Sequence, residues 1–140
     1  MNDFQGTWIL ESTDNFDGYM RKLGVNFIMR KLGNLAKPTQ EIKVNDEGEI
    51  YIKTITSSTI GKWSELTFKL DQEFDEKTID GRQVKSLVTK EEEDFVHTQN
   101  PSNGGPKTII RRRIEDGKYI MKLECDGEVC TRTYVKSKAA

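Results

Sequence analysis

Beyond residue 38, apolar and polar residues alternate along the chain, which is the pattern of strands that bury one face. Turn-forming residues interrupt the alternation at short intervals. Asp116-Gly117 and Asp126-Gly127 are the most specific of these breaks, because glycine adopts the positive φ of tight hairpin turns. The predicted strands cover residues 42–44, 50–55, 63–70, 84–89, 95–99, 108–114, 119–125 and 129–135. The pattern therefore predicts an antiparallel meander of β-hairpins.

Residues 15–36 are the exception, because their apolar residues recur at helical spacing on both sides of Gly24. Asp14 or Asn15 can cap the first of two short helices, since both side chains accept hydrogen bonds from free backbone amides. Gly24 can end that helix, and Asn26 can cap the second. A helix-turn-helix is thus expected within an otherwise all-β chain.

The length of 140 residues is typical of one domain, and we treat residues 1–140 as a single unit. An antiparallel meander of this size must protect its edge strands, and closing the sheet into a barrel does so directly. A small barrel can also enclose one ligand. Hydrophobic residues make up 34% and charged residues 32% of the chain, so its core is small or partly polar.

Charge and cysteine content limit the classes of partner. Lys and Arg number 22 against 23 Asp and Glu, and the net charge of −1 favours neither nucleic acid nor an anionic membrane as a general partner. The first residues lack the apolar run of a signal peptide, and no stretch is apolar enough to span a bilayer. Cys125 and Cys130 are too few for a disulfide framework, and with no secretory signal we expect reduced thiols in the cytoplasm. We also expect the protein to be a monomer.

The sequence offers little support for catalysis. His97 is the only histidine, and the chain has neither a cysteine at metal-binding spacing from it nor a Gly-x-Ser-x-Gly motif. The acidic residues lie beside turns or alternate outward along strands, and the acidic run 91–94 is typical of a solvated turn. We therefore expect neither an enzyme nor a bound metal or cofactor.

One arginine lies within the last predicted strand. Residues 130, 132 and 134 share a face, so Arg132 points inward if Cys130 and Tyr134 do. The tight turn before this strand sets its register and places Met121 opposite Arg132 and Leu123 opposite Cys130. All five side chains then share the same face of the sheet.

A second arginine is ambiguous from its pattern alone. The parity that buries Ile110 and Ile114 also buries Arg112, but Arg111, Arg112 and Arg113 could equally form a charged, exposed strand. A buried cation is costly unless an anion accompanies it. Two inward arginines and a tyrosine hydroxyl would form a planar carboxylate receptor, and the apolar residues around them would accept an alkyl chain. That combination is typical of a fatty-acid site.

Four short motifs extend this interpretation. They are Phe4-x-Gly6-x-Trp8, Asn15-Phe16-Asp17-x-Tyr19-Met20, Gly33-Asn34-Leu35-Ala36-Lys37-Pro38 and Cys130-Thr131-Arg132-x-Tyr134. Through them the chain resembles the intracellular lipid-binding proteins of the fatty acid-binding protein family over essentially its whole length. The resemblance implies an all-β fold, a ten-stranded antiparallel barrel of the β-clam type, capped by a helical lid over about residues 15–36.

The resemblance also implies a ligand site. The ligand carboxylate would lie against Arg132, Tyr134 and Arg112, although a slip of one residue to Arg111 or Arg113 stays open here. The family's pocket and portal positions correspond to Phe16, Met20, Val25, Pro38, His97 and Gln99, to which the inward face adds Met121 and Leu123. His97 would then be a polar residue of the cavity wall. The segments 57–63 and 100–106 are longer than in typical members, so either Ile60 or Trp63 could be the portal residue.

These observations favour an intracellular carrier that binds a long-chain fatty acid or a related carboxylate lipid non-covalently. The alternative is a lipid-signalling shuttle, which would take its ligand to the nucleus and a nuclear receptor. Its basic lid patch would consist of Arg21, Lys22, Arg30 and Lys31. The same four side chains could instead contact a membrane transiently, or merely keep the lid solvated.

Overall fold

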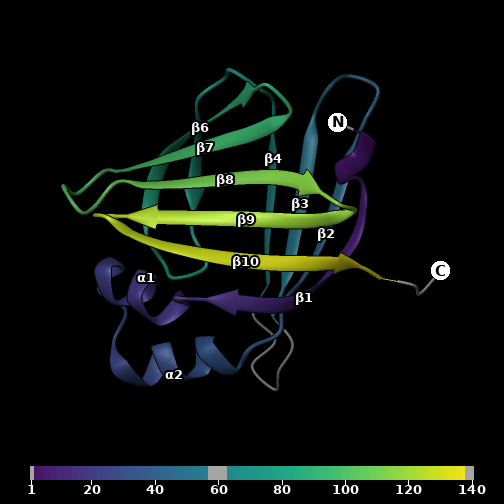
Figure 1. Cartoon of the computed structure of the whole chain (residues 1–140). Coiled ribbons are helices and arrows are strands. Elements are labelled where there is room, and N and C mark those ends of the chain that lie inside the picture. The colour runs from purple at the N-terminus through teal and green to yellow at the C-terminus, as the bar shows by residue number, and fades with distance from the viewer. Residues whose placement is uncertain (1, 57–62, 138–140) are drawn as a thin grey trace.

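The computed structural model describes residues 2–56 and 63–137, and it contains ten antiparallel strands with two helices at one end (Figure 1). The strands are β1 Gly6–Asp14, β2 Thr39–Val44, β3 Ile50–Ile55, β4 Trp63–Phe68, β5 Phe74–Lys77, β6 Gln83–Glu91, β7 Asp94–Pro101, β8 Thr108–Glu115, β9 Lys118–Cys125 and β10 Glu128–Lys136. They form one sheet in the order β4-β3-β2-β1-β10-β9-β8-β7-β6-β5. The first strand pairs with the last, which wraps the sheet into the nearly closed barrel that the sequence predicts.

Two strands are not indicated by the alternation of the sequence. β1 carries an irregularity between Leu10 and Ser12, which shifts the parity of its side chains. β5 has only four residues, and one of the side chains on its buried face is the acidic Glu76. The hydrophobic pattern therefore did not predict β1, because of its irregularity, or β5, because an acidic side chain lies on its buried face.

The two helices, α1 Phe16–Leu23 and α2 Phe27–Leu35, form the lid and confirm the predicted helix-turn-helix. Gly24 follows α1 in the left-handed conformation with φ of 86°, which an ordinary side chain would strain. The side chain of Asn26 accepts a hydrogen bond from the amide of Met29 at 2.9 Å, as expected of an N-cap.

The expected cap of α1 is wrong. Asn15 occupies the position before the helix with φ of 63°, but its side chain makes no capping bond, and Asp14 is the last residue of β1. Instead, Asn15 Nδ2 donates to Glu128 Oε2 at 2.8 Å and to the carbonyl oxygen of Val129 at 3.0 Å. Asn15 thus joins the start of the lid to β10, a partner that local sequence cannot reveal.

An aromatic cluster fills the part of the barrel away from the lid. The short helix η1 Asn2–Phe4 lies apart from α1 and α2 (Figure 1), and its Phe4 ring lies 4.8 Å from the ring of Phe95 and 6.1 Å from that of Tyr119. Trp8 is almost fully buried and donates from Nε1 to the carbonyl oxygen of Phe4 at 2.8 Å. This packing leaves the interior beneath the lid for a cavity.

Candidate functional site

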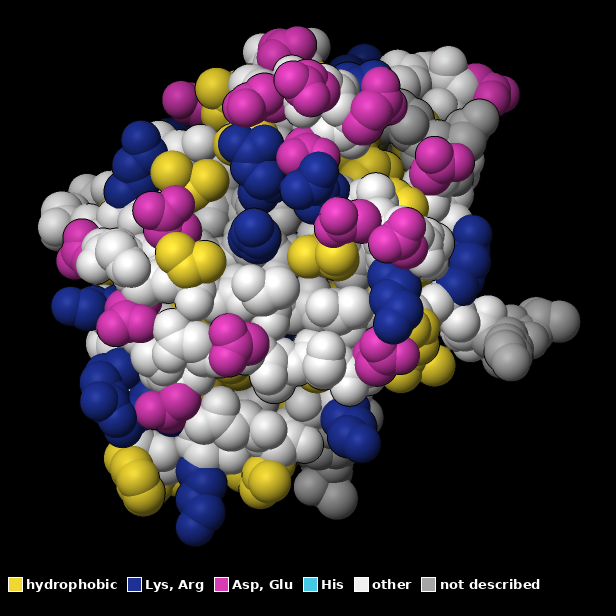
Figure 2. All heavy atoms as spheres, in the orientation of Figure 1, with side chains coloured by type: hydrophobic (Ala, Val, Ile, Leu, Met, Phe, Trp, Pro, Cys, Tyr) yellow, Lys and Arg dark blue, Asp and Glu magenta, His cyan; other side chains and the backbone are white. Residues whose placement is uncertain are grey.

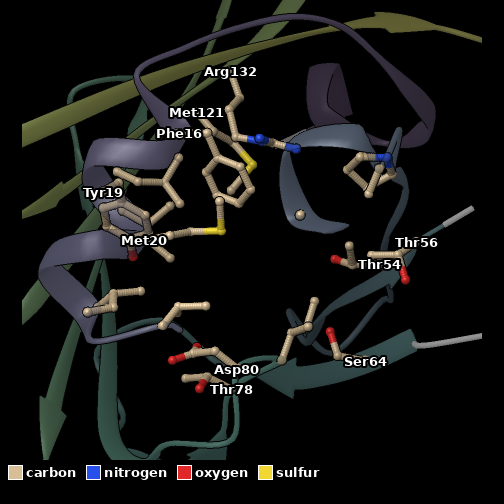
Figure 3. Close-up of a pocket in the computed structure, with 18 of the residues that line it drawn as sticks. Phe16, Tyr19, Met20, Thr54, Thr56, Ser64, Thr78, Asp80, Met121 and Arg132 are labelled. Carbon is tan, nitrogen blue, oxygen red and sulfur yellow. The ribbon is translucent and has the colours of Figure 1, made fainter. Parts of the chain in front are cut away.

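A cavity of about 700 Å³ lies inside the barrel beneath the lid. Side chains from both helices, from β2 to β4, from β7 to β10 and from the turn between β5 and β6 line it. Figure 3 shows Phe16, Tyr19 and Met20 of α1 reaching into this space on the side of Met121 and Arg132. Its volume falls within the range of small-molecule sites.

Most of the predicted site residues line this cavity. They are Phe16, Met20, Val25, Pro38, Gln99, Arg112, Met121, Leu123, Arg132 and Tyr134. The predicted register of the last hairpin is confirmed, because Met121 is opposite Arg132 and Leu123 is opposite Cys130. The choice of portal residue falls outside the described part of the chain, which includes neither Ile60 nor the side chain of Trp63.

Arg132 is a buried cation whose described contacts are uncharged. Its side chain is 4% exposed, and Nη1 donates to the hydroxyl oxygen of Thr13 at 3.2 Å. The guanidinium carbon lies 3.9 Å from the ring centroid of Phe16, so the first residue of α1 covers the cation. The ion pairs of the described residues include none to Arg132.

Tyr134 lies two residues from Arg132 on the same face, and it is 2% exposed. Burial raises the pKa of its hydroxyl, while Arg132 and then Arg112 act in the opposite direction. The hydroxyl therefore stays protonated at neutral pH and can donate a hydrogen bond to an acceptor beside Arg132.

The structure resolves the ambiguity at Arg112 in favour of the inward arrangement. Arg112 is 5% exposed, whereas Arg111 pairs with Asp94 at 3.1 Å on the outer surface and Arg113 lies 3.7 Å from the same carboxylate. Arg112 Nε donates to the hydroxyl oxygen of Tyr119 at 3.0 Å, and Nη1 lies 3.1 Å from Nδ1 of His97. Arg112 thus has two polar side chains as partners, and one of them, His97, connects it to a buried carboxylate.

A buried anion, Glu76, is connected to Arg112 through His97, and the sequence did not reveal it. Glu76 is only 7% exposed, so the expectation from the sequence that the acidic side chains point outward is wrong for this residue. Oε1 accepts hydrogen bonds from Ser86 at 2.7 Å and from Gln99 at 3.1 Å, and it lies 3.0 Å from Nε2 of His97. Burial alone would raise the pKa of Glu76, but the contacts with His97, Ser86 and Gln99 outweigh it and hold the pKa well below its usual range.

His97 connects the two charges rather than lining the cavity. It is fully buried, and it is not among the described residues that line the cavity, so the position expected for it in the wall is corrected. Burial and the neighbouring Arg112 lower its pKa, although Glu76 acts in the opposite direction. A neutral imidazole fits the geometry, with Nδ1 accepting from Arg112 and Nε2–H donating to Glu76.

The network continues around the barrel. Tyr119 donates to Oε1 of Gln40 at 2.7 Å, and Thr108 donates to Oε1 of Gln99 at 2.6 Å. These side chains lie on β2, β7, β8 and β9, so a belt of buried polar groups links strands from much of the sheet. Because its members bond to one another, the belt tolerates burial without a ligand.

The predicted basic patch on the lid is only partly free. Arg30 is held between the helices, where Nη1 donates to the carbonyl oxygen of Val25 at 2.9 Å and Nε contacts Asp17 at 3.2 Å. Arg21 pairs with the same Asp17 carboxylate at 3.3 Å, whereas Lys22 and Lys31 are exposed. Arg30 therefore serves chiefly to join the helices, and the surface cations are Arg21, Lys22 and Lys31.

The remaining candidate features are the two cysteines, a metal site and a membrane-spanning helix. Cys125 and Cys130 are buried free thiols. Within residues 2–56 and 63–137, no three His, Cys, Asp or Glu side chains gather as a metal site would require. Neither lid helix, nor any other helix in those ranges, has the length and apolar character needed to cross a membrane.

Comparison with known proteins identifies the family. The model of the lipocalin and cytosolic fatty-acid binding protein family matches residues 5–137. The chain belongs to this family. Among its relatives, sodium/calcium exchanger regulatory protein 1 of Doryteuthis pealeii is 42% identical over 94% of this chain and 95% of its own. Human cellular retinoic acid-binding protein 1 is 39% identical over 97% of this chain and 99% of its own.

The solved structures agree with the sequence relatives. A fatty acid transporter designated REP1-NXSQ has a TM-score of 0.90 and 40% identity, and the alignment covers 100% of both chains. The names of these relatives refer to two kinds of lipid acid, fatty acids and retinoic acid.

Proposed function

We propose that the protein binds a long-chain fatty acid, or a lipid with the same carboxylate headgroup, inside the barrel and carries or buffers it in the cytoplasm. The observation that supports this most is Arg132, a 4% exposed cation that lines the cavity with only neutral contacts described. A bound carboxylate would supply the missing anion, and a guanidinium can hold both carboxylate oxygens. No covalent step, metal or cofactor is needed.

The three predicted headgroup residues have unequal roles in this proposal. Arg132 binds the carboxylate directly, and Tyr134 donates a second hydrogen bond from the same strand. Nε and Nη1 of Arg112 already contact Tyr119 and His97, so only its remaining N–H groups can donate to the carboxylate. An alkyl tail of about sixteen carbons would contribute roughly 13 kcal/mol at about 0.8 kcal/mol per methylene. That gain exceeds all but the upper end of an association cost of about 4–15 kcal/mol.

The test is displacement of a fluorescent fatty-acid analogue by oleate, oleyl alcohol and retinol. We expect oleate to displace best, because an alcohol leaves the Arg132 cation without an anion. Arg132→Met should weaken oleate binding about tenfold or more, since hydrogen bonds to charged groups contribute about 1.5–3 kcal/mol each. Arg113→Met is the matched control, because that side chain is 43% exposed and points outward. Equal affinity for oleate and oleyl alcohol would contradict the proposal.

A second function, transient contact with an anionic membrane, is favoured by α2. None of its residues is buried, and Phe27, Ile28 and Leu35 are 67%, 71% and 74% exposed. Figure 2 shows apolar and basic side chains side by side along the lower margin, where α2 lies in Figure 1, and Lys31 is exposed on the same helix. An apolar helix face with flanking cations suits an anionic lipid surface.

The membrane proposal is tested by flotation with vesicles of neutral or anionic lipid. Ile28→Glu should abolish retention on anionic vesicles, while oleate binding in the barrel persists. Retention that is unaffected by Ile28→Glu would contradict it. The nuclear shuttle stays an alternative hypothesis, and ligand-dependent nuclear accumulation that is lost on neutralising Arg21 and Lys31 would favour it instead.

A further inference from the structure

An ion pair lines the cavity at the turn between β5 and β6. Arg82 Nε donates to Asp80 Oδ2 at 2.7 Å, and Nη2 lies 3.3 Å from Asp80 Oδ1. Both residues line the cavity, and their side chains are only 17% and 25% exposed. Figure 3 shows Thr78 and Asp80 on the side of the cavity opposite Arg132 and Met121. The cavity wall therefore carries a charged pair on the side opposite Arg132.

The turn holds this pair in a fixed position. Thr78 N donates to the carbonyl oxygen of Arg82 at 2.9 Å, and Arg82 N donates to the hydroxyl oxygen of Thr78 at 2.9 Å. Gly81 has φ of 93°, and its amide donates to the carbonyl oxygen of Thr78 at 2.9 Å. Because these hydrogen bonds fix the backbone of residues 78–82, the turn loses little conformational freedom when a ligand binds.

One donor of the pair is unused. Arg82 Nη1 is buried and finds no hydrogen-bond acceptor among the described residues, whereas Nε and Nη2 are occupied by Asp80. Burial raises the pKa of Tyr19 on α1, and the positive charge of Arg82 opposes that rise. Other atoms of Arg82 line the cavity, so a ligand oxygen that reached Nη1 would give this buried donor the partner that it lacks.

We propose that the Asp80–Arg82 pair is a second contact for the cargo, and that the preferred ligand is a fatty acid with a hydroxyl or carbonyl oxygen far from its carboxylate. This inference rests on the proposed function, because Arg132 must hold the carboxylate for the distal part of the chain to reach this turn. A wholly apolar tail leaves Arg82 Nη1 unpaired, whereas a distal oxygen accepts its hydrogen bond.

The charge of the pair defines the class of distal group. Asp80 already neutralises Arg82, so the local site carries no net charge to attract an anion. A second carboxylate on the ligand would approach the Asp80 carboxylate and be repelled, while a neutral oxygen would not. Replacing Asp80 by asparagine should reverse this preference, because Arg82 would then be an unneutralised cation.

The experiment compares hexadecanoic acid, a positional series of hydroxyhexadecanoic acids and hexadecanedioic acid by calorimetry. The quantity of interest is the ratio of hydroxy-acid to hexadecanoic-acid affinity in each variant. For at least one hydroxyl position, Arg82→Met should lower this ratio about tenfold, because it leaves a buried hydroxyl without its donor. Asp80→Asn should raise the affinity for hexadecanedioic acid relative to the hydroxy acids.

Lys85→Met is the matched control, since Lys85 is an exposed cation of the same strand pair that contacts Asp75 outside the cavity. Hexadecanoic acid reports on folding in every variant, because its binding depends on Arg132 and not on Arg82. If it binds with the expected Arg132 dependence but no hydroxyl position gives a ratio that depends on Arg82, only the distal contact is refuted. If hexadecanoic acid itself fails to bind the unmodified protein, the proposed function and this inference both fall.

Discussion

Replacing Glu76 by glutamine should destabilise the empty protein. The carboxylate of Glu76 has Ser86, His97 and Gln99 as hydrogen-bond partners. Bonds to a charged group contribute about 1.5–3 kcal/mol and neutral bonds about 0.5–1.5 kcal/mol, so losing the charge costs about 1 kcal/mol at each partner. We therefore expect Glu76→Gln to lower the free energy of unfolding by about 3 kcal/mol.

The same substitution should strengthen ligand binding. Arg112 loses its nearby internal anion when Glu76 is neutralised, and a bound carboxylate no longer faces that charge across the network. Oleate should thus bind the variant more tightly and raise its free energy of unfolding by more than it raises that of the unmodified protein. Arg112→Met in the Glu76→Gln background should recover part of the lost stability, because the unbalanced cation is then removed.

Urea denaturation with and without oleate measures both effects. Glu91→Gln is the control, since that side chain is 63% exposed on the surface and should change the free energy of unfolding by less than about 0.5 kcal/mol. Unchanged stability of Glu76→Gln, or weaker binding of oleate by it, would refute the role assigned to this carboxylate.

Two further predictions follow from the network and the lid. The pKa of His97 is lowered from 6.5, so below that pH the unfolded chain takes up a proton that the folded chain excludes. The free energy of unfolding should therefore fall as the pH drops through about 6.5. In urea titrations, His97→Gln should make that fall smaller. The lowered pKa of Glu76 adds a second loss as the pH falls below about 4.5. A curve that is flat between neutral pH and about 4.5 would contradict the His97 assignment, and a curve that falls no further below that value would contradict the Glu76 assignment. Asn15→Gly keeps the left-handed backbone but removes the hydrogen bonds from the start of the lid to β10. In stopped-flow measurements, oleate should then associate and dissociate faster at similar affinity. Unchanged rates would show that these hydrogen bonds do not restrain the lid.

Period-two alternation was sufficient to predict the features that repeat regularly. It placed Arg132 on the inner face, and the Asp126-Gly127 turn fixed its register opposite Met121. For Arg112 the alternation left two arrangements open, and the strand's outward neighbours decided between them by pairing Arg111 with Asp94. Strand parity is therefore a good guide wherever a strand is long and its turn is tight.

Features that depend on contacts between distant segments could not be predicted. Glu76 lies on a strand of four residues, too short for alternation to show which face is buried, and its partners come from β6 and β7. Asn15 was interpreted as a local cap, but its side chain bonds to β10 instead. Arg30 was assigned to a charged surface, yet it bonds to Asp17 of the other helix. In each case the deciding partner is set by the tertiary fold.

The central claim is that Arg132 holds a ligand carboxylate within the barrel. Carbon-13 NMR of carboxyl-labelled oleate, bound to the protein and titrated with acid, tests it most directly. A carboxylate beside Arg132 has its pKa lowered, so its signal should stay in the ionised position to lower pH than that of free oleate, and Arg132→Met should reverse the shift. A bound carboxyl group that titrates above the value for free oleate in the unmodified protein would mean that the headgroup lies in an apolar environment, and the account would be wrong.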